Sequence, residues 1–185
     1  MSETTRRRRR QQRGPLPQVT LTTKCTVEQV QTLWQAIMHD PLPYYMSDYT
    51  PREFHTLLTQ LGRTVLLVMG MIGGEVAGGL FITRDEGFPD TRKPLHCIVD
   101  LFICERFRGR GTLPLTRAWK AYLLETLGFP TFYCLVDPDH KACHHLLGMM
   151  GMYRVGTVPQ YLPRGGIARD VVLYSMAHPQ EVSNG

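Results

Sequence analysis

The sequence lacks a long apolar run and any closely spaced pair of cysteines. Nowhere in its 185 residues does a hydrophobic stretch approach the ~20 residues of a transmembrane helix. No apolar segment follows the N-terminal arginines, as it would in a secretory signal. The cysteines are odd in number and scattered: Cys25, Cys97, Cys104, Cys134 and Cys143. We therefore expect a cytoplasmic protein with reduced thiols and no membrane segment.

Negative charge is almost absent from the start of the chain, where Glu3 is the one acidic residue before position 15. Residues 6–10 and 13 are all arginine, so this tail alone accounts for the net charge of +5. A tail of this composition cannot bury apolar surface, and we expect it to be disordered. Two roles stay open for residues 6–13: attachment to nucleic acid by counterion release, or simple solubilisation.

Hydropathy patterning predicts one mixed α/β (α+β) domain at residues 18–178. We expect an N-terminal tail and linker at residues 1–17 and a flexible C-terminal tail at residues 179–185. Alternating or apolar runs predict strands at residues 19–22, 63–71, 76–83, 97–103, 131–136, 154–158 and 171–177. Amphipathic runs predict helices at residues 26–38, 50–61, 112–127 and 141–150. The order is β-α-α-β-β-β-α-β-α-β-β, with residues 85–93 and 159–169 as loops.

A turn at residues 106–111 joins an apolar strand to a helix. Its glycines, Gly109 and Gly111, allow positive φ and let backbone N–H groups point inward. Such a turn before a helix N-terminus is an anion site, and Thr112 is a candidate N-cap. Three arginines in the turn add positive charge. The predicted ligand is a phosphate or pyrophosphate.

The spacing Arg-x-x-Gly-x-Gly separates this turn from other phosphate-binding motifs. A P-loop would need Gly-Lys-Ser/Thr, and a dinucleotide fingerprint would need a third glycine where Pro114 stands. With Arg106, Gly109 and Gly111 in place after Ile103, the motif resembles the acyl-coenzyme A signature of the GNAT N-acetyltransferase superfamily. An ordinary basic strand-to-helix loop stays open as an alternative.

The resemblance to GNAT proteins extends over about residues 18–178 and implies their fold. That fold is a mixed, largely antiparallel sheet of about seven strands flanked by helices. The resemblance also implies acetyl-CoA as co-substrate. Its pantetheine arm would lie between the strands at residues 97–103 and 131–136, where these two strands splay apart. The residues that the resemblance assigns to CoA are Phe102, Ile103, Arg106, Phe107, Arg108, Gly109, Arg110, Gly111, Thr112, His140 and Cys143.

A second segment resembles the GNAT pattern Asn-x-x-Ala-x-x-Leu-Tyr-x-x-x-Gly-Phe. The helical spacing and the glycine agree, whereas the asparagine, alanine, tyrosine and phenylalanine are replaced. The tyrosine is the family's usual acid for the leaving thiolate. The matching positions here are His140, Cys143, Leu146, Leu147, Gly151 and Met152. The neighbouring histidines lack a second pair with zinc-ligand spacing, so we expect no metal site.

Asp100, inside the fourth strand, is the candidate general base for deprotonating an amine. His96, four residues earlier, shares its strand face. Tyr153 or Tyr161 could replace the missing tyrosine as acid. The alternative for Asp100 is a structural ion pair.

Three functions follow from these patterns. The first is transfer of an acetyl group from acetyl-CoA to an amine acceptor. The second is a catalytically inactive GNAT-like structural or nucleic-acid-associated protein, such as a virion component. The third is a regulator that binds CoA without transfer. The acceptor loops expected at residues 40–51, 85–93 and 159–169 carry no motif that identifies the amine.

Deleting residues 1–13 should leave folding and CoA binding intact, because the remaining chain has equal numbers of acidic and basic residues. Nucleic-acid affinity, if the tail provides it, should fall, and its dependence on salt should flatten. Filter binding of DNA and RNA over a salt series measures both. Equal affinity of the truncated and full chains would contradict a role for the tail.

Overall fold

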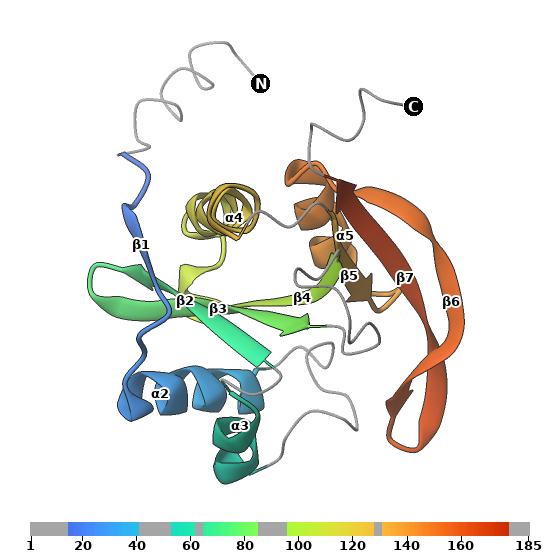
Figure 1. Cartoon of the computed structure of the whole chain (residues 1–185), viewed down its shortest axis with the longest axis horizontal. Coiled ribbons are helices and arrows are strands. Elements are labelled where there is room, and N and C mark those ends of the chain that lie inside the picture. Colours follow the sequence, from blue (N-terminus) through green and yellow to red (C-terminus); the bar gives the residue numbers. More distant parts are fainter. Residues whose placement is uncertain (1–14, 41–52, 62–64, 85–95, 128–130, 178–185) are drawn as a thin grey trace, which may run out of the picture.

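The computed structural model describes residues 15–40, 53–61, 65–84, 96–127 and 131–177 (Figure 1). The order of strands and helices expected from the sequence is confirmed over these residues. Their bounds are β1 (Val19–Thr22), α2 (Val27–Met38), α3 (Phe54–Gln60), β2 (Val65–Ile72), β3 (Glu75–Arg84), β4 (His96–Ile103), α4 (Thr112–Ala121), β5 (Thr131–Val136), α5 (Lys141–Met149), β6 (Tyr153–Arg164) and β7 (Ile167–Ala177). Of the expected tails, residues 1–14 and 179–185 lie outside the described residues.

One seven-stranded sheet runs through the molecule in the order β1-β2-β3-β4-β5-β7-β6. Every neighbouring pair is antiparallel except β4 and β5, which are parallel as the helical crossover between them requires. Helices α2 and α3 cover one face, and α4 and α5 cover the other (Figure 1). The mixed, largely antiparallel sheet flanked by helices is therefore confirmed.

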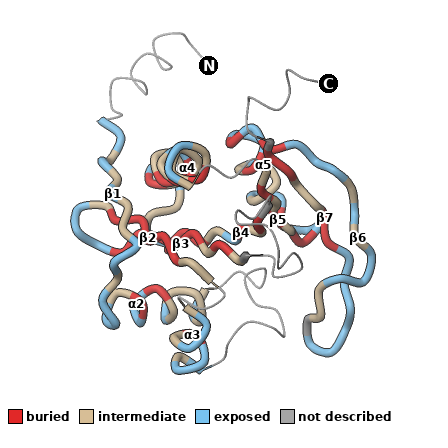
Figure 2. Tube along the Cα trace, in the orientation of Figure 1, coloured by how far each residue is buried: buried red, intermediate tan, exposed pale blue. Residues whose placement is uncertain are grey.

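Each face of the sheet has its own cluster of buried apolar residues, and Figure 2 shows where the buried residues lie along the chain. Beneath α4 and α5, Trp119 and Leu147 pack with the inward residues of β4 and β5. Beneath α2 and α3, Leu33 packs with residues that include Phe102 of β4. Since side chains alternate along a strand, Asp100 lies on the same face as Phe102, which is the α2–α3 face.

Helix α2 starts at a capping box and is held against the sheet. The Thr26 side chain accepts a hydrogen bond from the Gln29 amide at 3.2 Å, and the Gln29 side chain accepts from the Thr26 amide at 3.0 Å. Val30 and Leu33 are buried on its inner face. The helix ends at Met38, and Asp40 is the last residue described before residue 53.

Strands β4 and β5 are paired over three residues and then separate. The pairs are His96 with Thr131, Cys97 with Phe132 and Ile98 with Tyr133. Beyond them β4 stays paired with β3 up to Ile103, and β5 stays paired with β7 up to Val136. Each strand is thus held from its outer side, and the two carboxyl ends diverge. This is the splay that the GNAT resemblance implies.

The expected loop at residues 159–169 is wrong, because strands β6 and β7 continue through it as a hairpin. Gly165 and Gly166 form its two-residue turn, with φ of +61° and +74°. Strand β6 contains Pro159 and Pro163, which it tolerates because it is the outermost strand of the sheet. The ladder is also irregular between Val158 and Leu162, where a bulge interrupts the alternation that sequence patterns detect.

Two glycines paired across β2 and β3 let α4 lie close to the sheet. Gly70 is opposite Gly78, and the indole of Trp119 is buried over both. A Cβ on Gly78 would lie 2.3 Å from the carbonyl oxygen of Phe102 and 3.0 Å from the Trp119 ring. A side chain at Gly78 would therefore push apart β3, β4 and α4.

The substitution Gly78→Ala should lower the free energy of unfolding by ~1–3 kcal/mol, because the added methyl overpacks the core. Gly148→Ala is the matched control, since nothing lies within 4 Å of its Cβ. This change in helix α5 should stabilise by about 0.5–1 kcal/mol. Chemical denaturation of both variants measures the difference. A Gly78→Ala protein as stable as the wild type would contradict the close contact.

Candidate functional site

The turn between β4 and α4 is closed by its own hydrogen bonds. A 3-10 turn at Glu105–Phe107 leads into Gly109, which has φ of +88°. The Gly109 amide donates to the Thr112 hydroxyl at 3.1 Å, and the Gly111 amide donates to the Phe107 carbonyl at 3.1 Å. The prediction that Thr112 is the N-cap of α4 is therefore wrong, because Gly111 occupies that position. The Thr112 hydroxyl instead holds the preceding turn.

The two glycines of the turn differ in what surrounds them. A Cβ on Gly111 would lie 2.6 Å from the Phe107 carbonyl oxygen, so the turn itself requires glycine there. Gly109 needs glycine for its positive φ, yet no atom lies within 4 Å of where its Cβ would be. Gly109 therefore presents an open backbone surface near the N-terminus of α4, where an anion can approach.

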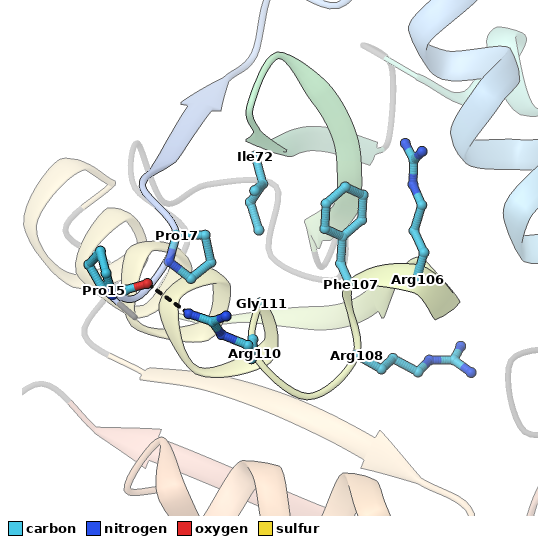
Figure 3. A pocket seen from close by; sticks show the side chains of 8 residues that line it. All are labelled: Pro15, Pro17, Ile72, Arg106, Phe107, Arg108, Arg110 and Gly111. Carbon is cyan, nitrogen blue, oxygen red and sulfur yellow. Dashed lines mark hydrogen bonds between the residues drawn. The ribbon is translucent and has the colours of Figure 1, made fainter. Parts of the chain in front are cut away.

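The three arginines of the turn point to three different parts of the protein (Figure 3). Arg106 pairs with Glu75 of β3 and lies over the Phe107 ring, its guanidinium carbon 4.7 Å from the centroid. Arg110 donates to the Pro15 carbonyl at 3.0 Å. Arg108 pairs with Asp40 at the end of α2. The side chains expected at phosphate groups therefore all have partners within the chain.

A cavity of about 290 Å³ lies beside this turn, between the end of β2 and the segment before β1 (Figure 3). Pro15, Pro17, Ile72 and Phe107 give it apolar walls, and the arginines of the turn add positive charge. Such a lining suits a ligand with an apolar part and an anionic part. The cavity adjoins the turn expected to hold pyrophosphate.

Asp100 lies on β4, two residues beyond the last pair with β5. Solvent reaches its side chain, but the protein around it removes much of the water that would solvate the carboxylate. This desolvation raises the pKa of the carboxyl to about 6. Among the described residues no basic side chain forms an ion pair with Asp100. The carboxyl can thus accept a proton near neutral pH.

Two cysteines lie within electrostatic range of Asp100. Burial, and then the charge of Asp100, raise the pKa of Cys143 to about 12. Burial likewise raises the pKa of Cys134, to which Cys143 and Asp100 also contribute. Both thiols stay protonated at neutral pH and are poor nucleophiles. The splay is therefore bordered by three elements: β4 with Asp100, β5 with Cys134 and α5 with Cys143.

The start of α5 carries a partly buried polar cluster on the other side of the splay. The Asp139 amide donates to the Asp137 carboxylate at 2.9 Å. His144 lies between the Tyr174 hydroxyl at 3.0 Å and the Asp137 carbonyl at 3.1 Å. His140 is buried, and burial followed by the charge of His144 lowers its pKa. His140 is therefore neutral at neutral pH.

Four further residues were predicted to belong to the site, namely Phe102, Ile103, His96 and Tyr153. Phe102 and Ile103 have buried side chains, so only their backbone can meet a ligand. His96 pairs with Thr131, and its side chain lies outside the described residues. Tyr153 is 57% exposed on β6, which β7 separates from β5. The structure therefore does not bring Tyr153 to Asp100.

Leu147, at the family's tyrosine position, is completely buried and offers no proton. Tyr133 is a phenol that sequence reasoning missed. It lies on β5 at the last paired position, opposite Ile98, and is half-buried. Strand alternation places it on the face that Asp100 occupies. Finding Tyr133 would have required the register between β4 and β5, which the sequence alone does not provide.

Neither a metal site nor a membrane span is found in the described part of the chain. No three His, Cys, Asp or Glu side chains there are grouped to bind a metal. None of the described helices combines the length and apolarity needed to cross a bilayer.

No protein-family model and no curated protein matches the sequence, whereas solved structures match its fold. RimJ of Mycobacterium smegmatis, in complex with CoA-disulfide, is 15% identical with a TM-score of 0.70, over 92% of this chain and 87% of that one. The ribosomal-protein-S5-alanine acetyltransferase of Vibrio fischeri is 13% identical with a TM-score of 0.68, over 90% and 96%. The microcin C7 self-immunity acetyltransferase MccE, in complex with acetyl-CoA and AMP, is 14% identical with a TM-score of 0.65, over 86% and 92%.

At these identities the likeness concerns the fold. The seven-stranded sheet, the splay of β4 and β5 and the glycine turn before α4 are the features that the GNAT resemblance predicts. The chain therefore has the fold of the GNAT N-acetyltransferases.

Proposed function

We propose that the protein is an acyl-CoA-dependent N-acyltransferase that moves an acetyl group from acetyl-CoA to an amine. The observation that carries this proposal is the position of Asp100. Asp100 is an accessible carboxyl with a pKa of about 6, at the point where β4 is no longer paired with β5. Structures of the same fold hold CoA-disulfide and acetyl-CoA, which supports acetyl-CoA as the donor.

The splay offers acetyl-CoA two kinds of binding group. Beyond Ile98, the β5-facing edge of β4 is open to the amide groups of a pantetheine arm, which would pair with it as a strand does. The open face of Gly109 at the head of α4 suits the pyrophosphate. His140 and Cys143, at the start of α5, would border the arm from the other side.

In the proposed reaction the amine nitrogen attacks the thioester carbonyl carbon, so a C–N bond forms and the C–S bond breaks. Asp100 takes the proton that the nitrogen loses. The leaving thiolate takes a proton, and Tyr133 is the donor we propose in place of the tyrosine missing at Leu147. The amine acceptor would approach from the α2–α3 face, which Asp100 and Tyr133 share.

One observation favours a second function, CoA binding without transfer. Leu147 is buried where the family has its acid, so transfer would need another proton donor, such as Tyr133. Binding of CoA together with no thiol release on any amine, peptide or ribosomal-protein acceptor would favour this regulator.

Binding of acetyl-CoA should raise the melting temperature. At ~100 times its Kd the ligand should add about 2.7 kcal/mol to the free energy of unfolding, because it binds only the folded state. Gly109→Ala should weaken this stabilisation by distorting the turn. Gly166→Ala is the matched control, since it also has a positive φ and open surroundings but lies at the tip of the β6–β7 hairpin. The absence of a shift in the wild type would overturn the proposal.

Asp100→Asn should lower kcat by ~10²–10⁴-fold while CoA affinity is kept, as is typical when a positioned base is lost. Wild-type kcat/KM should rise with pH around 6 as Asp100 loses its proton, and this rise should vanish in the variant. Thiol release from acetyl-CoA over a panel of amines is the assay. Asp170→Asn, on the hairpin, is the control carboxylate. Wild-type turnover in Asp100→Asn would exclude Asp100 as the base.

A further inference from the structure

Arg108 is held by two acceptors that belong to different elements. Its Nε–H donates to the Ile103 carbonyl at 3.1 Å, at the end of β4. Its Nη2 donates to the Asp40 carboxylate, beyond the end of α2. The guanidinium carbon also lies 5.9 Å from the centroid of the Phe102 ring. A planar guanidinium suits this forked arrangement, which a lysine ammonium cannot reproduce.

The ion pair of Arg108 is much less accessible than the other pair of the turn. The Asp40 side chain is 1% exposed and that of Arg108 is 26% exposed. For Arg106 and Glu75 the exposed fractions are 58% and 56%. An exposed pair contributes little, whereas removing one member of a buried pair leaves an uncompensated charge. The contact of Arg108 with Asp40 is therefore the stronger constraint on the turn.

Both ends of this contact are firmly placed. Asp40 follows helix α2, which is fixed by its buried residues Val30 and Leu33. Arg108 directly precedes Gly109, and its own amide donates to the Glu105 carbonyl at 3.0 Å. The charges of Arg108 and Asp40 also influence the pKa of His140, so the pair lies near the start of α5 as well. It thus joins α2, β4 and the turn close to the mouth of the splay.

We propose that Arg108 is a positioning residue whose ion pair with Asp40 fixes the CoA-binding turn relative to helix α2, rather than a ligand of the phosphates. The inference rests on the proposed function at this same site. The pair orients Gly109, where the pyrophosphate approaches. It also ties that turn to the helix that covers the acceptor face, so the donor and acceptor sides keep a fixed relation.

The test compares Asp40→Asn, Arg108→Met, Arg108→Lys and the Asp40→Asn/Arg108→Met double variant. Calorimetric titration with CoA and with pantetheine, which lacks phosphates, is done well below each melting temperature. Asp40→Asn and Arg108→Met should each weaken CoA binding by ~10-fold, and the double variant by about the same factor, because all three break one shared contact. Arg108→Lys keeps a positive charge beside Asp40, so the variant should fold. It should still weaken CoA binding, because a lysine ammonium cannot reproduce the forked contact.

Glu75→Gln is the matched control, because it removes the carboxylate partner of another arginine in the same turn. It should change CoA affinity less than ~3-fold, as expected for an exposed pair. If Asp40→Asn bound CoA as well as the wild type or better, the freed Arg108 would be a phosphate ligand and the inference would be wrong. Lower melting temperatures with unchanged CoA affinity would show a purely structural pair and would also overturn it.

The proposed function and this inference fail in different ways. A wild-type protein that binds neither CoA nor pantetheine would remove the proposed function, and the inference with it. If the wild type binds CoA, and if Asp40→Asn and Arg108→Lys bind it with the same affinity, the proposed function stays in place. Only the role of Arg108 would then be removed.

Discussion

The separation of β4 from β5 after three residue pairs is the constraint on which the candidate site depends. β3 holds β4 along its whole outer edge, and β7 holds β5, so neither strand can follow the other. The part of β4 that has no pairing with β5 carries Asp100, the glycine turn follows the end of β4, and helix α5 starts just beyond β5. Groups distant in the sequence therefore gather at the carboxyl ends of the only parallel pair in the sheet.

The arginines of the turn show how a charge pattern can serve the protein's own structure. Sequence reasoning assigned Arg106, Arg108 and Arg110 to phosphate groups, since cations follow one another around two glycines. In the structure they contact Glu75, Asp40 and the Pro15 carbonyl, three partners from separate parts of the chain. Since the amides of Gly109 and Gly111 also donate within the turn, the attraction for an anion here comes from the dipole of α4 and from the net positive charge.

Local patterns explain which features the sequence predicted. The order of elements, the glycine turn and the place of Asp100 follow from hydrophobic periodicity and from residues adjacent in the chain. Long-range features could not be predicted: Asp40 is 68 positions away from Arg108, and Tyr133 becomes relevant only through its register with Ile98. The continuation of strands β6 and β7 through residues 159–169 was missed because prolines and a bulge hide the alternation of side chains. The predicted N-cap role of Thr112 was wrong because its hydroxyl accepts from the preceding Gly109 amide and not from an amide of the helix.

The hydrogen bond from Arg110 to Pro15 fixes where the N-terminal segment joins the body of the protein. Arg13 is two residues before Pro15, and at ~3.3–3.6 Å per residue the chain can separate them by no more than ~7 Å. A nucleic acid bound by these arginines, which is one of the two roles left open for residues 6–13, would be tethered near the turn. Lysines or other amines attached to that polymer would experience a raised effective concentration at the splay, set by the length of the tether.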